Sequence, residues 1–179
     1  MKPFEPIDTE TRYRGRCIRV DEDRMQTADG RVVTFEVVRH PGAAAIVPLL
    51  DDARVILIRQ YRHAIGEWIL ELPAGTLDGG EQAIDCAARE LIEETGYRAR
   101  DWLGLGAIWT TPGFTDERIE LFLARGLEPD QQRLEADEAI ELRLTPLTEA
   151  LAMTVDGRIS DGKSVAGLQR AAASLRELA

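Results

Sequence analysis

Three glutamates, Glu90, Glu93 and Glu94, lie within one short segment whose pattern predicts a helix. At 100° per residue, Glu94 lies about 40° from Glu90 on one side and Glu93 about 60° on the other. The three carboxylates therefore share one helix face, where their mutual repulsion destabilises the bare helix. A hard divalent cation removes that repulsion, and oxygen ligands suit Mg²⁺ or Mn²⁺. The alternative is an acidic helix face that is simply solvated.

The residues around the glutamates indicate a loop followed by a helix. Asp78 and Glu81 have the spacing of a capping box, and Gly96 suits the left-handed conformation that often ends a helix. We therefore expect a helix from about 79 to 95. Gly75 belongs to the preceding loop, where a small residue lets the backbone approach a ligand closely. The remaining face of the helix is apolar and should pack in the core: Ile84, Ala87, Ala88, Leu91 and Thr95.

The full spacing resembles the Nudix box, G-x5-E-x7-R-E-U-x-E-E-x-G-U, where U is a bulky apolar residue. Every fixed position is filled between Gly75 and Gly96, and the loose position is Tyr97, aromatic where the family usually has an aliphatic residue. The resemblance implies a pyrophosphohydrolase that cleaves a nucleoside diphosphate linked to another group. It also implies Mg²⁺ or Mn²⁺ held by several ligands on this loop and helix: the carbonyl of Ala74, Glu90 and Glu94, with Glu93 close by.

Further features resemble the ADP-ribose pyrophosphatase branch of this family. They are the long N-terminal extension, the segments 59–62 and 70–75, and the loop 111–117 with its Pro112. Each segment also has an ordinary explanation, as a strand end or a turn. Together they imply hydrolysis of ADP-ribose to AMP and ribose 5-phosphate by a homodimer. The residues implied in substrate binding are Phe35, Glu36, Arg59, Arg62, Glu71 and Pro112.

The resemblance also implies roles in catalysis. Arg89 is expected to orient the glutamates rather than contact the substrate, with Glu81 as its partner. The base that deprotonates the attacking water is left open between Glu138 or Glu135, in a loop before the last core strand, and Glu93.

Composition and charge exclude other classes of protein. The net charge of −10 argues against nucleic acid as a partner, because basic surfaces attract nucleic acid. The cysteines, Cys17 and Cys86, form no disulfide framework and no metal-ligand spacing. No apolar run has transmembrane length and the N-terminus has no signal pattern, so we expect no membrane partner and a cytoplasmic location. The expected partner is a small nucleotide sugar.

The coarse pattern of strands and helices predicts an α/β Nudix fold, with a mixed β-sheet between helices and an N-terminal antiparallel β extension. Residues 1–42 are expected to form a β subdomain for dimerisation, and residues 43–179 the hydrolase domain. Asp29-Gly30 indicates a hairpin, and Thr145 and Pro146 the start of a helix. The expected strands are 13–20, 32–38, 43–50, 54–61, 68–72, 102–110, 118–125 and 139–145, and the later helices 146–155 and 162–178.

Three alternatives stay open. The substrate could be another nucleoside diphosphate sugar such as GDP-mannose, or an oxidised nucleoside diphosphate. The protein could also be a non-catalytic nucleotide sensor, but such regulators usually carry a degraded box, and here the box is intact. The N-terminal strands could extend the core sheet of their own monomer, with Phe35 buried there, instead of serving a dimer.

Overall fold

The computed structural model describes residues 2–134 and 139–177, which divide into two compact units. The first unit comprises residues 1–42 together with the segment 109–118, and the second comprises residues 43–108 and 119–179. The sequence pattern indicates the break after Gly42, but not that a segment from the middle of the chain joins the N-terminal strands.

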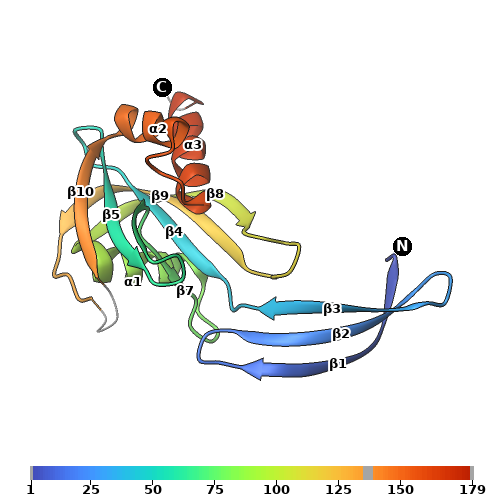
Figure 1. The fold of residues 1–179 in the computed structure, drawn as a ribbon. Coiled ribbons are helices and arrows are strands. Elements are labelled where there is room, and N and C mark those ends of the chain that lie inside the picture. The colour runs from blue at the N-terminus through green and yellow to red at the C-terminus, as the bar shows by residue number, and fades with distance from the viewer. Residues whose placement is uncertain (1, 135–138, 178–179) are drawn as a thin grey trace. The chain divides into compact units, whose positions relative to one another are not determined.

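The first unit is a three-stranded antiparallel sheet in the order β1-β2-β3 (Figure 1). The hairpin predicted at Asp29-Gly30 is confirmed, with Gly30 at a φ of 85°. The strand predicted at 13–20 is wrong, because the chain reverses within it and Tyr13 lies opposite Val20. The strands are β1 (Phe4–Arg14), β2 (Arg19–Thr27) and β3 (Val32–Arg39).

The second unit contains the remaining strands in two sheets. One has the order β7-β4-β9-β8 and is mixed, since β4 runs parallel to β9 and antiparallel to β7. The other has the order β10-β5-β6 and is antiparallel. The strands are β4 (Ala43–Pro48), β5 (Arg54–Arg62), β6 (Glu67–Glu71), β7 (Ala74–Thr76), β8 (Tyr97–Trp109), β9 (Arg118–Pro129) and β10 (Ile140–Pro146).

Within the described part of this unit, three helices cover the strands: α1 (Ala83–Thr95), α2 (Leu147–Asp156) and α3 (Gly162–Glu177). Helix α1 lies on one side of β4, and α2 and α3 lie on the other (Figure 1). Alternate residues of β4 enter the two cores: Ile46 packs with Leu91 of α1, and Val47 lies in the cluster that contains Leu168 of α3. Each fully buried leucine stabilises the fold by about 2 kcal/mol. The predicted α/β class, with mixed strands between helices, is confirmed.

Two helix starts differ from the prediction by a few residues. Asp78 and Glu81 form a separate turn, in which the Asp78 N–H donates to the Glu81 carboxylate at 3.1 Å, and α1 begins only at Ala83. Thr145 pairs with Val55 in β10, so α2 begins at Leu147. The end of α1 is confirmed, because Gly96 adopts the left-handed conformation at a φ of 70°.

Candidate active site

Two of the three glutamates on α1 are buried. Glu90 and Glu94 lie one helical turn apart among the buried residues of the helix, whereas Glu93 is partly exposed. On the face that the three glutamates share, Glu90 and Glu94 thus form an inner pair and Glu93 lies at the outer edge. Burying a carboxylate is costly unless positive charge or hydrogen bonds compensate it, which makes the inner pair the chemically informative feature.

The backbone of β7 lies directly against this pair. The Ala74 N–H donates to Oε2 of Glu94 at 2.8 Å. A Cβ on Gly75 would lie 1.8 Å from Oε1 of Glu90 and 1.9 Å from its Cδ, so only glycine leaves room for this carboxylate. The missing side chain of Gly75 thus makes room for Glu90, a candidate metal ligand.

Arg89 connects the acidic residues of the box. Its guanidinium donates to Glu81 at 3.0 and 3.1 Å, to Glu90 at 2.6 Å, to Glu93 at 3.1 Å and to the Thr76 carbonyl at 3.2 Å. The hydrogen bond to Glu81 is the main cause that raises the pKa of Arg89 above its usual value. The same bond holds the pKa of Glu81 below its usual range. The structure thus brings Arg89 together with Glu81, Glu90 and Glu93.

Cys86 lies beside the same loop and is buried. Its thiol is near the carbonyls of Gly75 and Thr76, at 3.5 and 3.6 Å. Burial raises the pKa of the Cys86 thiol to about 12, so the thiolate form is absent at neutral pH.

The donor chemistry of the pair fits a hard divalent cation. Among the described residues, no three acidic, histidine or cysteine side chains converge as a ready-made metal cage. Glu90 and Glu94 nevertheless offer buried carboxylate oxygens beside the backbone of Ala74, the ligand type that Mg²⁺ and Mn²⁺ prefer. In this arrangement Arg89 provides the positive charge next to Glu90.

Arg62 and Glu71 form a second charged pair. Nε and Nη2 of Arg62 donate to the two carboxylate oxygens of Glu71 at 2.6 and 2.8 Å. Burial alone would raise the pKa of Glu71, but the hydrogen bond from Arg62 and the charge of Lys163 outweigh it and hold the pKa below its usual value. The side chain of Glu71 is 1% exposed and that of Arg62 is 40% exposed, so Arg62 is partly accessible while its partner is not.

The sequence reasoning missed three residues that extend this pair. Lys163 also contacts Glu71. At the start of α3, Asp161 accepts hydrogen bonds from Lys163 and from the hydroxyl of Ser164. A signal for part of this group exists in the sequence, because Asp161 followed three residues later by Ser164 fits the start of a helix. Nothing in the local pattern links these residues to Glu71, which is 92 positions from Lys163.

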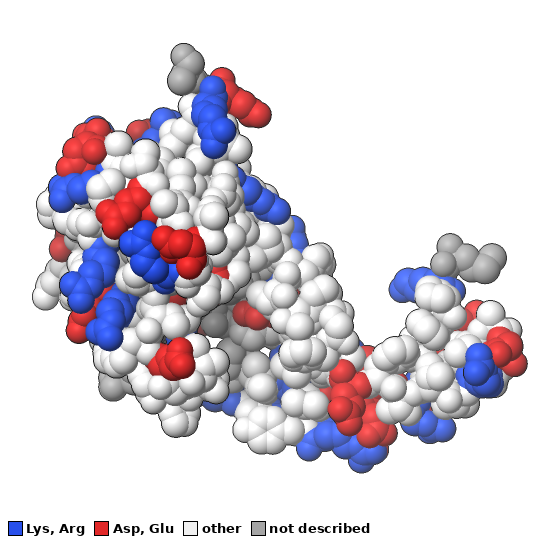
Figure 2. Space-filling model, turned by 45° about the horizontal axis from the view of Figure 1, so that its top comes forward, with Lys and Arg blue, Asp and Glu red and all other residues white. Residues whose placement is uncertain are grey.

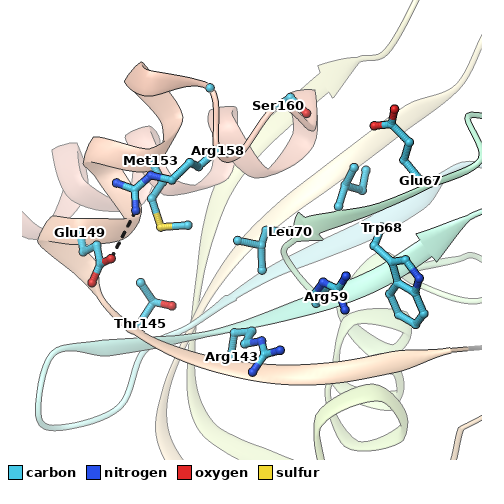
Figure 3. Close-up of a pocket in the computed structure, with 12 residues that line it drawn as sticks. Arg59, Glu67, Trp68, Leu70, Arg143, Thr145, Glu149, Met153, Arg158 and Ser160 are labelled. Atoms are coloured by element: carbon cyan, nitrogen blue, oxygen red, sulfur yellow. Dashed lines mark hydrogen bonds and ion pairs between the residues drawn. The ribbon is translucent and has the colours of Figure 1, made fainter.

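Arg59 lies apart from Arg62, although both belong to β5. Positions separated by three residues point to opposite faces of a strand. The Arg59 guanidinium lies over the ring of Trp68, with its Cζ 4.6 Å from the ring centroid. Arg59 also lines a pocket of about 520 Å³ between the β10-β5-β6 sheet and the end of α2 (Figure 3). Its walls also include Arg143 and Arg158, the latter paired with Glu149. The structure therefore separates two arginines that the sequence pattern grouped together.

The other predicted site residues lie in the first unit or outside the described residues. Phe35 is exposed and stacks edge-on against Phe4, with ring centroids 5.2 Å apart. Glu36 is exposed on the same strand. Pro112 lies in a loop that bonds to β3, where the Val38 N–H donates to the Phe114 carbonyl at 2.8 Å. Glu135 and Glu138 lie outside the described residues.

Comparison with known proteins shows the family of this chain. The family model of the NUDIX domain matches residues 39–167, which include the loop before α1, α1 itself, and the charged groups around Arg89 and around Arg62. The chain therefore belongs to the Nudix family.

Individual relatives match over most of the chain. An ADP-ribose pyrophosphatase of Bacillus subtilis is 34% identical to this chain over 94% of both chains. A protein of the same name from Mycobacterium tuberculosis is 39% identical over 92% of this chain and 81% of its own. A methanol dehydrogenase activator of Bacillus methanolicus is 37% identical over 91% of this chain and 89% of its own. A GDP-mannose pyrophosphatase of Citrobacter koseri is 36% identical over 73% of this chain and 76% of its own.

A solved structure shows the same fold. The crystal structure of an ADP compounds hydrolase superimposes with a TM-score of 0.88, covering 99% of this chain and 97% of its own, at 23% identity. The Nudix fold expected from the box is thereby confirmed.

Proposed function

We propose that this protein is an Mg²⁺-dependent pyrophosphohydrolase, with Mn²⁺ able to substitute, that cleaves ADP-ribose to AMP and ribose 5-phosphate. The observation that carries the proposal is the buried pair Glu90 and Glu94 against the backbone of Ala74 and Gly75. The two relatives named ADP-ribose pyrophosphatase support the choice of substrate.

Glu90, Glu94 and the Ala74 carbonyl would hold the metal ion, with Glu93 at the exposed edge of the same face. When bound, the ion supplies positive charge to the diphosphate and lowers the pKa of a water molecule. Arg89 keeps Glu90 and Glu93 in place through its bonds at 2.6 and 3.1 Å. Arg89 is itself held in place beside these carboxylates, because it also donates to Glu81 and to the Thr76 carbonyl.

The reaction requires a base and a bond exchange at phosphorus. The oxygen of water bonds to one phosphorus, the bridging P–O bond breaks, and the proton of the water passes to a carboxylate. Glu93 is the candidate base among the described residues, because it is partly exposed at the edge of the acidic face. Glu138 and then Glu135 are the alternatives outside the described residues.

Substrate charge must be met by local groups in this acidic protein. The net charge is −10, and acidic side chains lie among the basic ones on the face drawn in Figure 2. The whole-molecule field therefore repels a diphosphate. Arg62 is suited to attract it, because its side chain is partly exposed and its guanidinium is held by a buried carboxylate. Arg59 lines a separate pocket, and its role in substrate binding stays a prediction.

Arg62→Ala is expected to raise the KM for ADP-ribose about tenfold and to leave kcat similar, because binding is lost equally in the ground and transition states. Steady-state kinetics at saturating Mg²⁺ measures both constants. A collapse of kcat at unchanged KM would show that Arg62 acts on the transition state instead.

The alternatives differ in substrate or in turnover. A GDP-mannose hydrolase is the second candidate, favoured by the relative of that name. Incubation with Mg²⁺ and a panel of ADP-ribose, GDP-mannose and oxidised nucleoside diphosphates distinguishes the hydrolase readings. Nucleotide binding without turnover of any panel member would favour the sensor.

We further propose a cytoplasmic homodimer in which residues 1–42 contribute to the interface and, through Phe35 and Glu36, to the site of the partner subunit. Pro112 lies outside these residues, and its contact with the substrate stays a prediction. Three strands form a separate unit with an exposed Phe35, which argues against burial of that side chain in the sheet of its own monomer. A three-stranded sheet needs a hydrophobic face or a packing partner to be stable, and β1 is exposed along nearly its whole length. Among the described residues, no helix has the length and apolarity to cross a membrane.

The full chain is expected to sediment at twice the mass of one chain, and a chain starting at Ala43 as an inactive monomer. Loss of activity follows because the truncation removes Phe35 and Glu36. Analytical ultracentrifugation with a parallel turnover assay measures both properties. A full-length protein that is monomeric and fully active would contradict the shared site.

A further inference from the structure

A buried polar cluster joins the start of α3 to the pair formed by Arg62 and Glu71. Nζ of Lys163 contacts Oε2 of Glu71 and lies 3.0 Å from Oδ2 of Asp161. The Lys163 side chain is only 10% exposed. The chain contains twenty arginines and two lysines, Lys2 and Lys163. The compact ammonium group suits this enclosed position, where it provides three donors around one atom.

The same cluster fixes the chain that leads into β7. Oδ2 of Asp161 accepts the N–H of Ser164 at 2.9 Å, which satisfies a free donor of the first helical turn. Oγ of Ser164 accepts the N–H of Leu72 at 2.7 Å. Helix and strand end lie in close contact, since a Cβ on Gly167 would lie 2.6 Å from Cδ1 of Leu72. The start of α3 thus holds both Glu71 and the residue that follows it.

We propose that Lys163 is a positioning residue for substrate binding, which acts through Glu71 on the guanidinium of Arg62. Arg62 binds both oxygens of Glu71, so the plane of this carboxylate sets the direction of the guanidinium. Lys163, whose side chain is only 10% exposed, contacts one of those oxygens. The inference rests on the proposed function, because it takes Arg62 to be a substrate-binding group.

A purely structural role, in which Lys163 only anchors α3, is the competing explanation. The bond between Ser164 and Leu72 already joins the helix to the strand end without Lys163. The contacts of Lys163 lead instead, through one buried carboxylate, to an arginine whose side chain is 40% exposed. Loss of Lys163 leaves Glu71 buried with one cation fewer, which frees the carboxylate to turn and Arg62 with it.

The test uses Lys163→Met in the full chain, with Lys163→Gln as a milder variant that keeps a donor if the first fails to fold. Arg170→Met is the matched control, because Arg170 also anchors α3, through the carbonyls of Leu105 and Ala107, without touching this cluster. Steady-state kinetics with ADP-ribose and Mg²⁺ is measured for the Lys163 variant alone and for the same variant combined with Arg62→Ala. The ¹⁵N signal of the Arg62 Nε–H is followed in the metal-free protein.

Lys163→Met is expected to raise KM about tenfold with kcat retained, because displacement of a binding group by roughly 1 Å has effects of this order or larger. It should add nothing to Arg62→Ala, and the protected Arg62 Nε–H signal should be lost. Arg170→Met should lower the melting temperature and leave KM unchanged. The proposal is overturned if KM and the Nε–H signal stay as in the wild type, or if the Lys163 effect persists without Arg62. Absence of ADP-ribose turnover in the wild type would refute the proposed function, and the Nε–H signal would then still decide the Lys163–Arg62 coupling.

Discussion

Glutamine in place of Glu90 or of Glu94 is expected to reduce the kcat for ADP-ribose about a hundredfold or more. The metal ion supplies several kcal/mol to the reaction, and each 1.4 kcal/mol is a factor of ten in rate. The fold should be retained, because both residues lie on one crowded acidic face and the substitution relieves like-charge repulsion. Turnover at saturating Mg²⁺ and thermal unfolding measure the two effects separately.

Glu81→Gln is the matched control for these variants. Glu81 carries the same charge and also bonds to Arg89, but it lies before α1 and is not placed among the ligands. A loss of about tenfold is expected, as for a residue that orients the ligands without binding the metal itself. More than a tenth of wild-type activity in Glu90→Gln or Glu94→Gln would contradict the ligand assignment.

Alanine in place of Gly75 is expected to reduce turnover by about two orders of magnitude, because misplacing a catalytic group by roughly 1 Å has effects of this size. The added Cβ would lie 1.8 Å from Oε1 of Glu90 and 2.5 Å from its Cγ, so the Glu90 side chain must leave its place. Isothermal titration with Mn²⁺ should show weakened metal binding in the same variant.

Gly79→Ala provides the comparison for Gly75→Ala. Gly79 lies in the loop before the same helix, and a Cβ there meets no atom within 4 Å. Activity and Mn²⁺ affinity close to those of the wild type are expected. Equal losses at both glycines would indicate a general sensitivity of the loop, and the specific contact with Glu90 would then not explain the effect.

The parts of the site that follow one another in sequence could be predicted well. The spacing from Gly75 to Gly96 places the glutamates on one helix face, and helix periodicity is a local property of the chain. The structure adds that Glu90 and Glu94 are buried while Glu93 remains partly exposed. That difference depends on packing of α1 against β4 and β7, which no local pattern specifies.

The parts that depend on distant segments could not be predicted. Lys163 reaches Glu71 because the start of α3 lies at Glu71 and Leu72, 92 positions away from Glu71 in the chain. Arg59 is separated from Arg62 by the alternation of β5. The helix start moved from about 79 to Ala83 because Asp78 and Glu81 form their own turn. The prediction of a strand at 13–20 was wrong because this segment contains the end of β1, a turn and the start of β2. Its partial alternation does not reveal the turn, which becomes clear only from the pairing of Tyr13 with Val20.

The most direct test of the account is metal-dependent cleavage of ADP-ribose by the full chain. Protein stripped with EDTA is incubated with ADP-ribose, without metal and with Mg²⁺, and the products are separated by ion-exchange chromatography. We expect AMP and ribose 5-phosphate in equal amounts with Mg²⁺, none without it, and far slower release of GMP from GDP-mannose under the same conditions. Undiminished cleavage in EDTA, or intact ADP-ribose beside rapid hydrolysis of GDP-mannose, would contradict it.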